Sequence, residues 1–144
     1  MIPNKFMQES LNQAKIAFEK DEVPVGCVIV CNGEVIAKAY NQTRKLTNSF
    51  AHAEILALQQ ASKIKKSSCL NDCDLYVTLE PCLMCFGAIS WAKIKNLYFG
   101  AFDEKFGIFS LNNSIKNYYK PEIYSGICEE DSSKLLQDFF RNKR

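Results

Sequence analysis

Two short motifs constrain the fold of this chain more than any other feature. The first is Ala51-His52-Ala53-Glu54, and the second is Glu80-Pro81-Cys82-Leu83-Met84-Cys85. They supply one imidazole, two thiols and one further carboxylate, which are the parts of a catalytic zinc site with three protein ligands and an open fourth position. A fold that uses both motifs must bring residues 52, 82 and 85 together around one ion.

Each motif is predicted to begin a helix. Cys82 and Cys85 are three residues apart, so on a helix they share a face, and a helix N-terminus favours their thiolate forms. Pro81 suits a helix entry because its ring presets φ and its missing N–H would be unpaired there. His52 and Glu54 share a cavity only if His52 lies at the very start of its helix. We therefore expect two helix N-termini to converge on a zinc ion held by His52, Cys82 and Cys85, with Glu54 left free as the catalytic acid/base.

Other interpretations of these residues are weaker. His52 is the only histidine, and a lone histidine is more often a hydrogen-bonded core residue, while a C-x-x-C alone can be a redox pair. The combination of both motifs favours a metal site. A rival is an all-thiolate structural zinc site in which Cys69 and Cys73 join Cys82 and Cys85. It leaves the first motif unexplained.

Composition constrains the domain organisation and the cellular location of the protein more than the identity of its binding partner. The 144 residues, 47% hydrophobic and 24% charged, are typical of one globular domain spanning residues 1–144. No apolar run approaches the ~20 residues of a membrane span, and the start has no secretory pattern. We therefore expect a cytoplasmic protein without membrane contact and with mostly reduced cysteines. The net charge of +2 barely points to nucleic acid.

Hydrophobic periodicity predicts alternating helices and strands, in a three-layer α/β/α fold with a central mixed five-stranded sheet. The apolar helix over 82–92 is expected to be buried, and the long irregular stretch 101–120 to be functional. No G-x-G-x-x-G follows a strand, so no nucleotide cofactor is expected. Helices are predicted over 6–20, 52–66, 82–92 and around 135–140, and strands over 25–31, 34–40, 75–79, 96–100 and 122–125.

Segments from about residue 6 to 141 resemble the cytidine deaminase superfamily and, within it, the bacterial tRNA-specific adenosine deaminases. They include Glu22-Val23-Pro24-Val25-Gly26, Ala51-His52-Ala53-Glu54-Ile55, Tyr76-Val77-Thr78-Leu79-Glu80-Pro81-Cys82, Phe99-Gly100-Ala101 and Asp138-Phe139-Phe140-Arg141. The zinc motif is shared by all base deaminases of the superfamily, so the other segments carry the adenosine assignment. The resemblance implies a cytidine deaminase-like fold and one Zn²⁺ per subunit. It also implies a homodimer that binds a tRNA anticodon loop and converts its wobble adenosine to inosine.

The same resemblance implies a substrate-binding set. Asn41 matches a residue whose amide contacts the adenine edge, and the backbone N–H of Ala53 matches a second contact to the base. Val23 matches a pocket-wall residue, and Asp103 matches one that contacts the flanking nucleotide. A structural role stays open for two of them, because Asn41 can cap a turn and Asp103 a helix.

Departures from the family pattern fall in predicted substrate loops. Phe102 stands where the family often has Arg, and Ile108-Phe109 replaces a small-residue pair beside Gly107. The stretch Ser110 to Pro121 lacks the usual histidines, and Asn48-Ser49-Phe50 differs from the common Asp-Pro-Thr. This chain therefore differs from the family in its predicted RNA contacts and not in its chemistry.

Two other functions stay open. One is deamination of free cytosine, guanine or a nucleotide by the same chemistry, and the other is a non-catalytic, zinc-stabilised RNA-binding subunit. Inosine formation in an anticodon stem-loop, compared with turnover of free bases, distinguishes the first from tRNA deamination. A non-catalytic subunit would bind tRNA and release no ammonia, and the retention of Glu54 argues against it.

Overall fold

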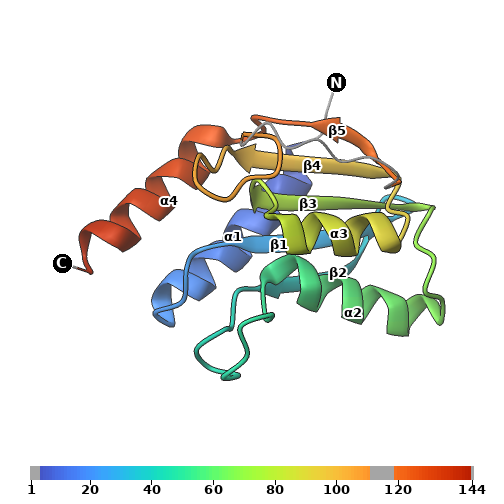
Figure 1. Ribbon diagram of the computed structural model, residues 1–144, viewed down its shortest axis with the longest axis horizontal. Coiled ribbons are helices and arrows are strands. Elements are labelled where there is room, and N and C mark those ends of the chain that lie inside the picture. The colour runs from blue at the N-terminus through green and yellow to red at the C-terminus, as the bar shows by residue number, and fades with distance from the viewer. Residues whose placement is uncertain (1–3, 111–118, 144) are drawn as a thin grey trace.

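A mixed sheet of five strands forms the middle of the protein, with the order β2-β1-β3-β4-β5. The computed structural model describes residues 4–110 and 119–143 (Figure 1). The pairs β1–β2 and β1–β3 are antiparallel, and the pairs β3–β4 and β4–β5 are parallel. The strands are β1 (Gly26–Cys31), β2 (Glu34–Tyr40), β3 (Cys73–Leu79), β4 (Asn96–Ala101) and β5 (Glu122–Tyr124). The helices are α1 (Lys5–Glu19), α2 (Ala53–Lys65), α3 (Leu83–Trp91) and α4 (Glu129–Arg141).

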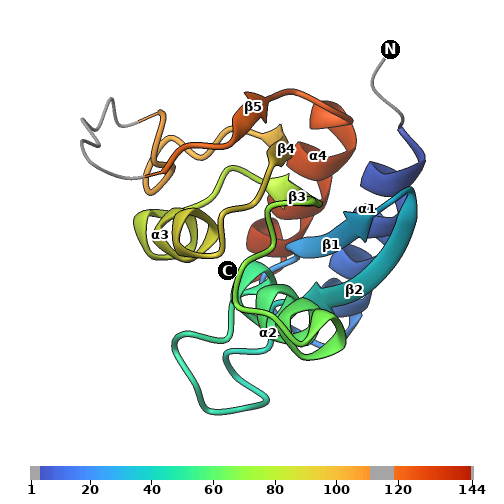
Figure 2. The same ribbon diagram turned by 90° about the vertical axis from the view of Figure 1, so that its right-hand side faces the viewer.

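Helices cover both faces of the sheet, as Figures 1 and 2 show. α1 and α4 pack on one face and contact each other, while α2 and α3 pack together on the opposite face. The predicted three-layer α/β/α arrangement with a mixed five-stranded sheet is confirmed.

Strand β1 explains why the sheet needs a layer on each face. All six of its residues are buried, and alternate side chains point to opposite faces of a strand. Cys27 and Ile29 join the larger apolar cluster beneath α2 and α3, whereas Val28 and Val30 join the smaller cluster beneath α1. A continuous apolar run is therefore the pattern of a strand covered on both sides.

Apart from α4, the observed elements begin and end within two residues of the predicted ones. α4 begins at Glu129, six residues before the segment around 135–140 that its apolar residues indicated, and β3 starts at Cys73 and not at Leu75. Cys73 and Asp74 pair with Cys31 and Val30 of β1, so backbone pairing with a neighbouring strand extends β3 through a polar residue.

The prediction that the helix over 82–92 is buried is wrong for one of its faces. Phe86 and Ile89 are buried, but Leu83 is 62% and Trp91 78% exposed. α3 lies in an outer layer, so only the side that faces the sheet is covered. Since its composition is apolar all round, periodicity could not indicate which side that would be.

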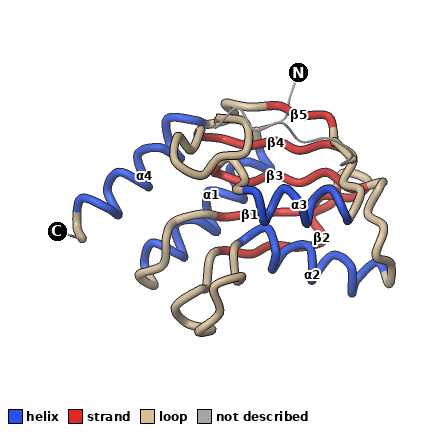
Figure 3. Tube along the Cα trace, viewed as in Figure 1, coloured by secondary structure: helices blue, strands red, loops and turns tan. Residues whose placement is uncertain are grey.

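The two helices that carry the motifs, α2 and α3, begin at the same end of the sheet. In the tube view of Figure 3, the N-termini of α2 and α3 lie next to each other, beside the loops that follow β3 and β4. Within residues 4–110 and 119–143, none of the helices has the length and apolar character needed to cross a membrane.

Candidate active site

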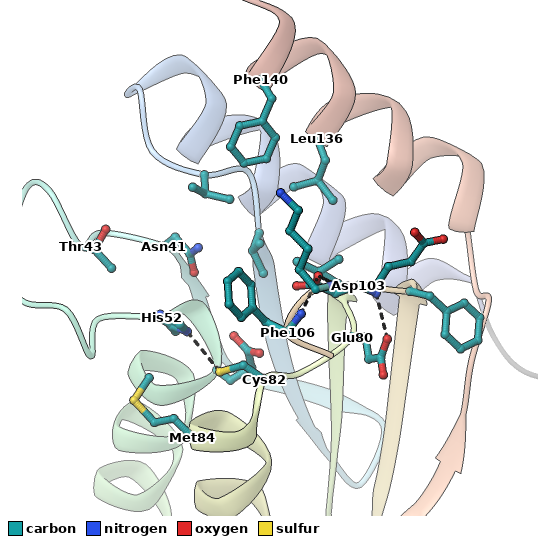
Figure 4. A pocket seen from close by; sticks show the side chains of 17 residues that line it. Asn41, Thr43, His52, Glu80, Cys82, Met84, Asp103, Phe106, Leu136 and Phe140 are labelled. Carbon is teal, nitrogen blue, oxygen red and sulfur yellow. Dashed lines mark hydrogen bonds between the residues drawn. The ribbon is translucent and has the colours of Figure 1, made fainter. Parts of the chain in front are cut away.

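The two motifs meet where α2 and α3 begin (Figure 4). His52 is the N-cap residue of α2, Cys82 is the N-cap residue of α3, and Cys85 lies in the first turn of α3. His52 Nδ1 lies 3.8 Å from Cys82 Sγ and 3.4 Å from Cys85 Sγ. The predicted convergence of three ligand atoms is therefore present, and all three lie within 4.8 Å of one another.

This donor set fits a zinc ion. Tetrahedral Zn²⁺ with bonds of about 2.0 Å to nitrogen and about 2.3 Å to sulfur separates the two donor atoms by about 3.5 Å. The two nitrogen–sulfur distances of 3.4 and 3.8 Å lie on either side of that value. One imidazole and two thiols also match a catalytic site in which the fourth position takes water or substrate.

The three ligands stabilise negative charge on sulfur. Hydrogen bonds from Cys85 and then from His52 lower the pKa of the Cys82 thiol to about 4. The hydrogen bond to Cys82, together with burial, raises the pKa of Cys85 far above its usual range, and the hydrogen bond to Cys82 also raises the pKa of His52. Cys82 is therefore a thiolate with two hydrogen-bond donors beside it. This charge suits a metal cation, because a bound cation deprotonates the thiols that coordinate it.

Glu54 lies beside this cluster in the first turn of α2. Glu54 is only 4% exposed. Burial, and next the charge of Cys82, raise the pKa of Glu54 to about 7. A carboxyl group with a pKa near neutrality can both accept and donate a proton under physiological conditions.

The cluster forms part of the lining of a cavity of about 950 Å³. Figure 4 shows His52 and Cys82 on one side and Leu136 and Phe140 of α4 on the other, with Phe106 between them. The volume lies within the range of small-molecule sites, about 300–1,000 Å³. Predicted site residues in the lining are Val23, Asn41, His52, Glu54, Cys82 and Asp103.

Two predicted substrate-binding groups contact each other. Asn41 Oδ1 accepts a hydrogen bond of 2.7 Å from the backbone N–H of Ala53, the first residue of α2. Asn41 thus has the structural role that its residue type left open, and the Ala53 N–H is already paired. Within the described residues the Asn41 Nδ2 has no hydrogen-bond partner, so this amide retains a donor beside the cavity.

Asp103 also has a structural role, although it caps a turn and not a helix. Its Oδ1 accepts hydrogen bonds of 3.0 and 3.1 Å from the backbone N–H groups of Lys105 and Phe106. The side chain thereby shapes the loop that follows β4. It lies at the cavity, where it was predicted to contact a flanking nucleotide.

Several residues of the site were not identified from the sequence. Leu136 and Phe140 line the cavity from α4, and their spacing of four residues indicates only that they share a helix face. Phe106 lines it from an irregular loop. Glu80 also lines the cavity although it is buried, and its place next to Pro81 was the one available signal. Of the long stretch expected to be functional, residues 111–118 lie outside the described residues.

The rival all-thiolate zinc site is contradicted. Cys73 lies at the start of β3 and groups with Cys31 and Asp72, away from Cys82 and Cys85. Lys65 Nζ lies 2.6 Å from Asp72 Oδ2 and 3.4 Å from Cys31 Sγ, so an ammonium group already balances the charge there. None of the seven cysteines forms a disulfide with another in this structure.

Comparison with known families agrees with the metal-site geometry. Residues 2–101 match the family described as the cytidine and deoxycytidylate deaminase zinc-binding region. This chain belongs to that deaminase family. The match covers both motifs and the elements β1 to β4 that position them.

Named relatives and solved structures of deaminases are similar over nearly the whole chain. A tRNA-specific adenosine deaminase of Rickettsia bellii is 49% identical, with 96% of this chain and 99% of the relative covered. A solved structure from a study of A-to-I editing by tRNA:A34 deaminases has a TM-score of 0.88 and 42% identity, covering 93% of this chain and 100% of that one. A guanine deaminase of Nitrosomonas europaea, 22% identical with a TM-score of 0.82 over 96% and 84% of the two chains, shares the fold.

Proposed function

We propose that this protein is a zinc-dependent deaminase that converts adenosine to inosine at the wobble position of a tRNA anticodon. The observation that carries this proposal is the buried Glu54 next to the His52–Cys82–Cys85 cluster in the cavity lining. The tRNA substrate is supported by relatives that are 43–49% identical and named tRNA-specific adenosine deaminases.

The reaction replaces the exocyclic amine of adenine by oxygen from water and releases ammonia. Zn²⁺ held by His52 Nδ1, Cys82 Sγ and Cys85 Sγ would supply the Lewis acid that activates a water molecule for this attack. Glu54 accepts a proton from the attacking water on its carboxylate and donates it to the ring nitrogen of the base. It then takes the remaining proton from the hydroxyl group now on the ring carbon and delivers it to the amine, so the C–N bond breaks, ammonia leaves and the C=O bond of inosine forms. A carboxyl group whose pKa is near 7 suits both steps.

The cavity walls orient the base. Asn41 donates from Nδ2 to the edge of the adenine, while Val23 and Val25 provide apolar surface against the ring. The target base must leave its stack to enter, which costs least where it is unpaired, as in an anticodon loop. An RNA loop is therefore a better substrate for this site than a base in a duplex.

Mass analysis of nucleosides tests the function directly. The zinc-loaded protein is incubated with an anticodon stem-loop that has adenosine at the wobble position, and inosine is expected at that position alone. Free adenine, guanine, cytosine and CMP are assayed in parallel. Turnover of a free base without inosine in the stem-loop would identify a small-molecule deaminase instead. Binding of the stem-loop without ammonia release would identify a non-catalytic subunit.

Asn41→Asp tests the proposed contact to the base. Aspartate keeps an oxygen that accepts the Ala53 N–H but removes the Nδ2 donor, so α2 keeps its cap while the base loses a hydrogen bond. We expect kcat/KM for the stem-loop to fall about tenfold or more, with the zinc content unchanged. Asn12→Asp is the control for the same change of residue type, because Asn12 is exposed in α1 and lies outside the cavity lining. Equal losses in both variants would contradict the assignment.

We further propose that the protein acts as a homodimer. Leu83 and Trp91 leave apolar surface exposed on α3, and such surface is commonly covered by a partner chain. Light scattering at assay concentrations is expected to give twice the 16.4 kDa of one chain. A monomer that is fully active would contradict this proposal.

A further inference from the structure

Glu80 is a buried carboxylate that the proposed chemistry does not use. It lies between the end of β3 and the zinc ligand Cys82, and it is only 2% exposed. It is absent from the metal-binding cluster. Burial of an acidic side chain is costly unless its oxygens are hydrogen-bonded, so the groups around Glu80 indicate its role.

Four donors surround the two carboxylate oxygens. Oε1 accepts a hydrogen bond of 2.8 Å from the backbone N–H of Asp103 and a further one from the hydroxyl of Ser110. Oε2 accepts hydrogen bonds of 2.8 Å from the backbone N–H groups of Phe109 and Ser110. Among residues 4–110 and 119–143, no lysine or arginine forms a salt bridge with Glu80. Backbone and hydroxyl donors alone satisfy a group that only accepts.

These donors belong to the two ends of one loop. The 102–110 loop follows β4, and its residues 102–106 line the cavity. Glu80 binds the loop at residue 103 and again at residues 109 and 110, so a single side chain closes it (Figure 4 shows the bond to Asp103). The loop also packs directly on the carboxyl group, because a Cβ at Gly107 would lie 2.3 Å from Glu80 Cδ.

The held part of the loop offers groups that suit a nucleotide next to the target base. Phe102 is 48% and Phe106 67% exposed, and aromatic faces stack on bases of any sequence. Lys105 places a cation in the same lining. The backbone that carries these side chains is held in place by its hydrogen bonds to Glu80.

We propose that Glu80 is a positioning residue for RNA binding. It holds the 102–110 loop as the cavity wall that receives the nucleotide flanking the target adenosine. This inference rests on the proposed function, since it assigns a role within the same site. Glu80 also belongs to the cavity lining, but both of its carboxylate oxygens accept hydrogen bonds from the loop and it lies outside the metal-binding cluster. Its loss should therefore affect substrate affinity more than chemistry.

Glu80→Gln tests this role. Glutamine keeps the shape of the side chain but turns an NH₂ group toward backbone N–H donors. At least one hydrogen bond between residue 80 and the loop is therefore lost. The variant is expected to fold, because Phe109 still packs edge-on against Phe86 and parallel to Phe99. We expect KM for the anticodon stem-loop to rise about tenfold, with kcat and zinc content within about twofold of the unchanged protein.

Ser10→Ala is a control for loss of a buried hydrogen-bonding group alone. Ser10 Oγ is buried on the opposite face of the sheet and donates to the carbonyl oxygens of Phe6 and Tyr76. This variant should lose thermal stability without a change in KM. Gly107→Ala is a second test of the position of the loop. The added methyl group would lie 2.3 Å from the Glu80 carboxyl and 2.5 Å from the Asp103 carbonyl oxygen, so it displaces the contact between Glu80 and the loop and should also raise KM.

Each outcome decides the inference. An unchanged KM in both Glu80→Gln and Gly107→Ala would overturn it, and so would a fall in kcat accompanied by loss of zinc, which would make Glu80 a support of the metal ligands. If the unchanged protein forms no inosine in the stem-loop, the proposed function fails. Direct titration of the same stem-loop then still tests the loop, since weaker binding by Glu80→Gln is expected there as well.

Discussion

Glu54→Gln is expected to retain its zinc and to lose about 10²–10⁴-fold in kcat, the range that general acid–base catalysis contributes. Glutamine has nearly the same shape, so the cavity and the cluster stay intact. It cannot accept a proton from water or deliver one to the ring nitrogen. The carboxyl group is buried and its pKa is raised to about 7. An exposed side chain has neither this position nor this environment, so none can take over the proton transfer. Metal analysis and stem-loop kinetics on one preparation measure both quantities.

The matched control for this substitution is Glu34→Gln, at an exposed glutamate at the start of β2. It changes the net charge equally and should leave kcat unaltered. A Glu54→Gln protein with full zinc content and normal turnover would show that the carboxylate is not the proton carrier. Loss of zinc from this variant would instead make Glu54 part of the metal site.

Cys82→Ala is expected to abolish both zinc binding and deamination. In the proposed site three ligands hold the ion, and removal of one leaves an imidazole and a single sulfur, too few for a tetrahedral site. The thermal midpoint should fall as well, because a ligand that binds only the folded state stabilises it. Metal analysis after dialysis, activity and thermal unfolding in the presence and absence of a chelator measure these effects.

Cys69→Ala is the control for loss of a thiol. Cys69 is exposed and lies outside the cluster, so zinc content and activity should be unchanged. Loss of zinc on this substitution would revive the all-thiolate site that the structure contradicts. A Cys82→Ala protein that keeps one zinc and its activity would disprove the assigned ligand set.

Local sequence patterns predicted most of the fold. Continuous apolar residues indicated β1 and helical spacing indicated α1. The pair Asn32-Gly33, a typical hairpin signal, lies at the turn between β1 and β2. These features depend on interactions between near neighbours in the chain, so they can be predicted one segment at a time. The metal cluster was predictable for a different reason, because one imidazole and two thiols have few other uses in combination with a nearby carboxylate.

Contacts between distant segments were not predictable in the same way. The pairing of Asn41 Oδ1 with the Ala53 N–H, the exposure of Trp91 and the closure of the 102–110 loop by Glu80 all depend on how layers pack. In the sequence, Glu80 is an acidic residue before a proline, and nothing in its neighbourhood indicates that its partners lie more than twenty positions later.

The sequence by itself therefore determined the order of helices and strands, the three metal ligands and the acid beside them, since each follows from local periodicity or from the chemistry of a side-chain type. Only the tertiary structure decided which surfaces enclose the cavity, namely α4 and the loop that Glu80 holds. The physical reason is that burial and hydrogen bonding of these groups arise when separate elements pack together, and no single segment contains that information.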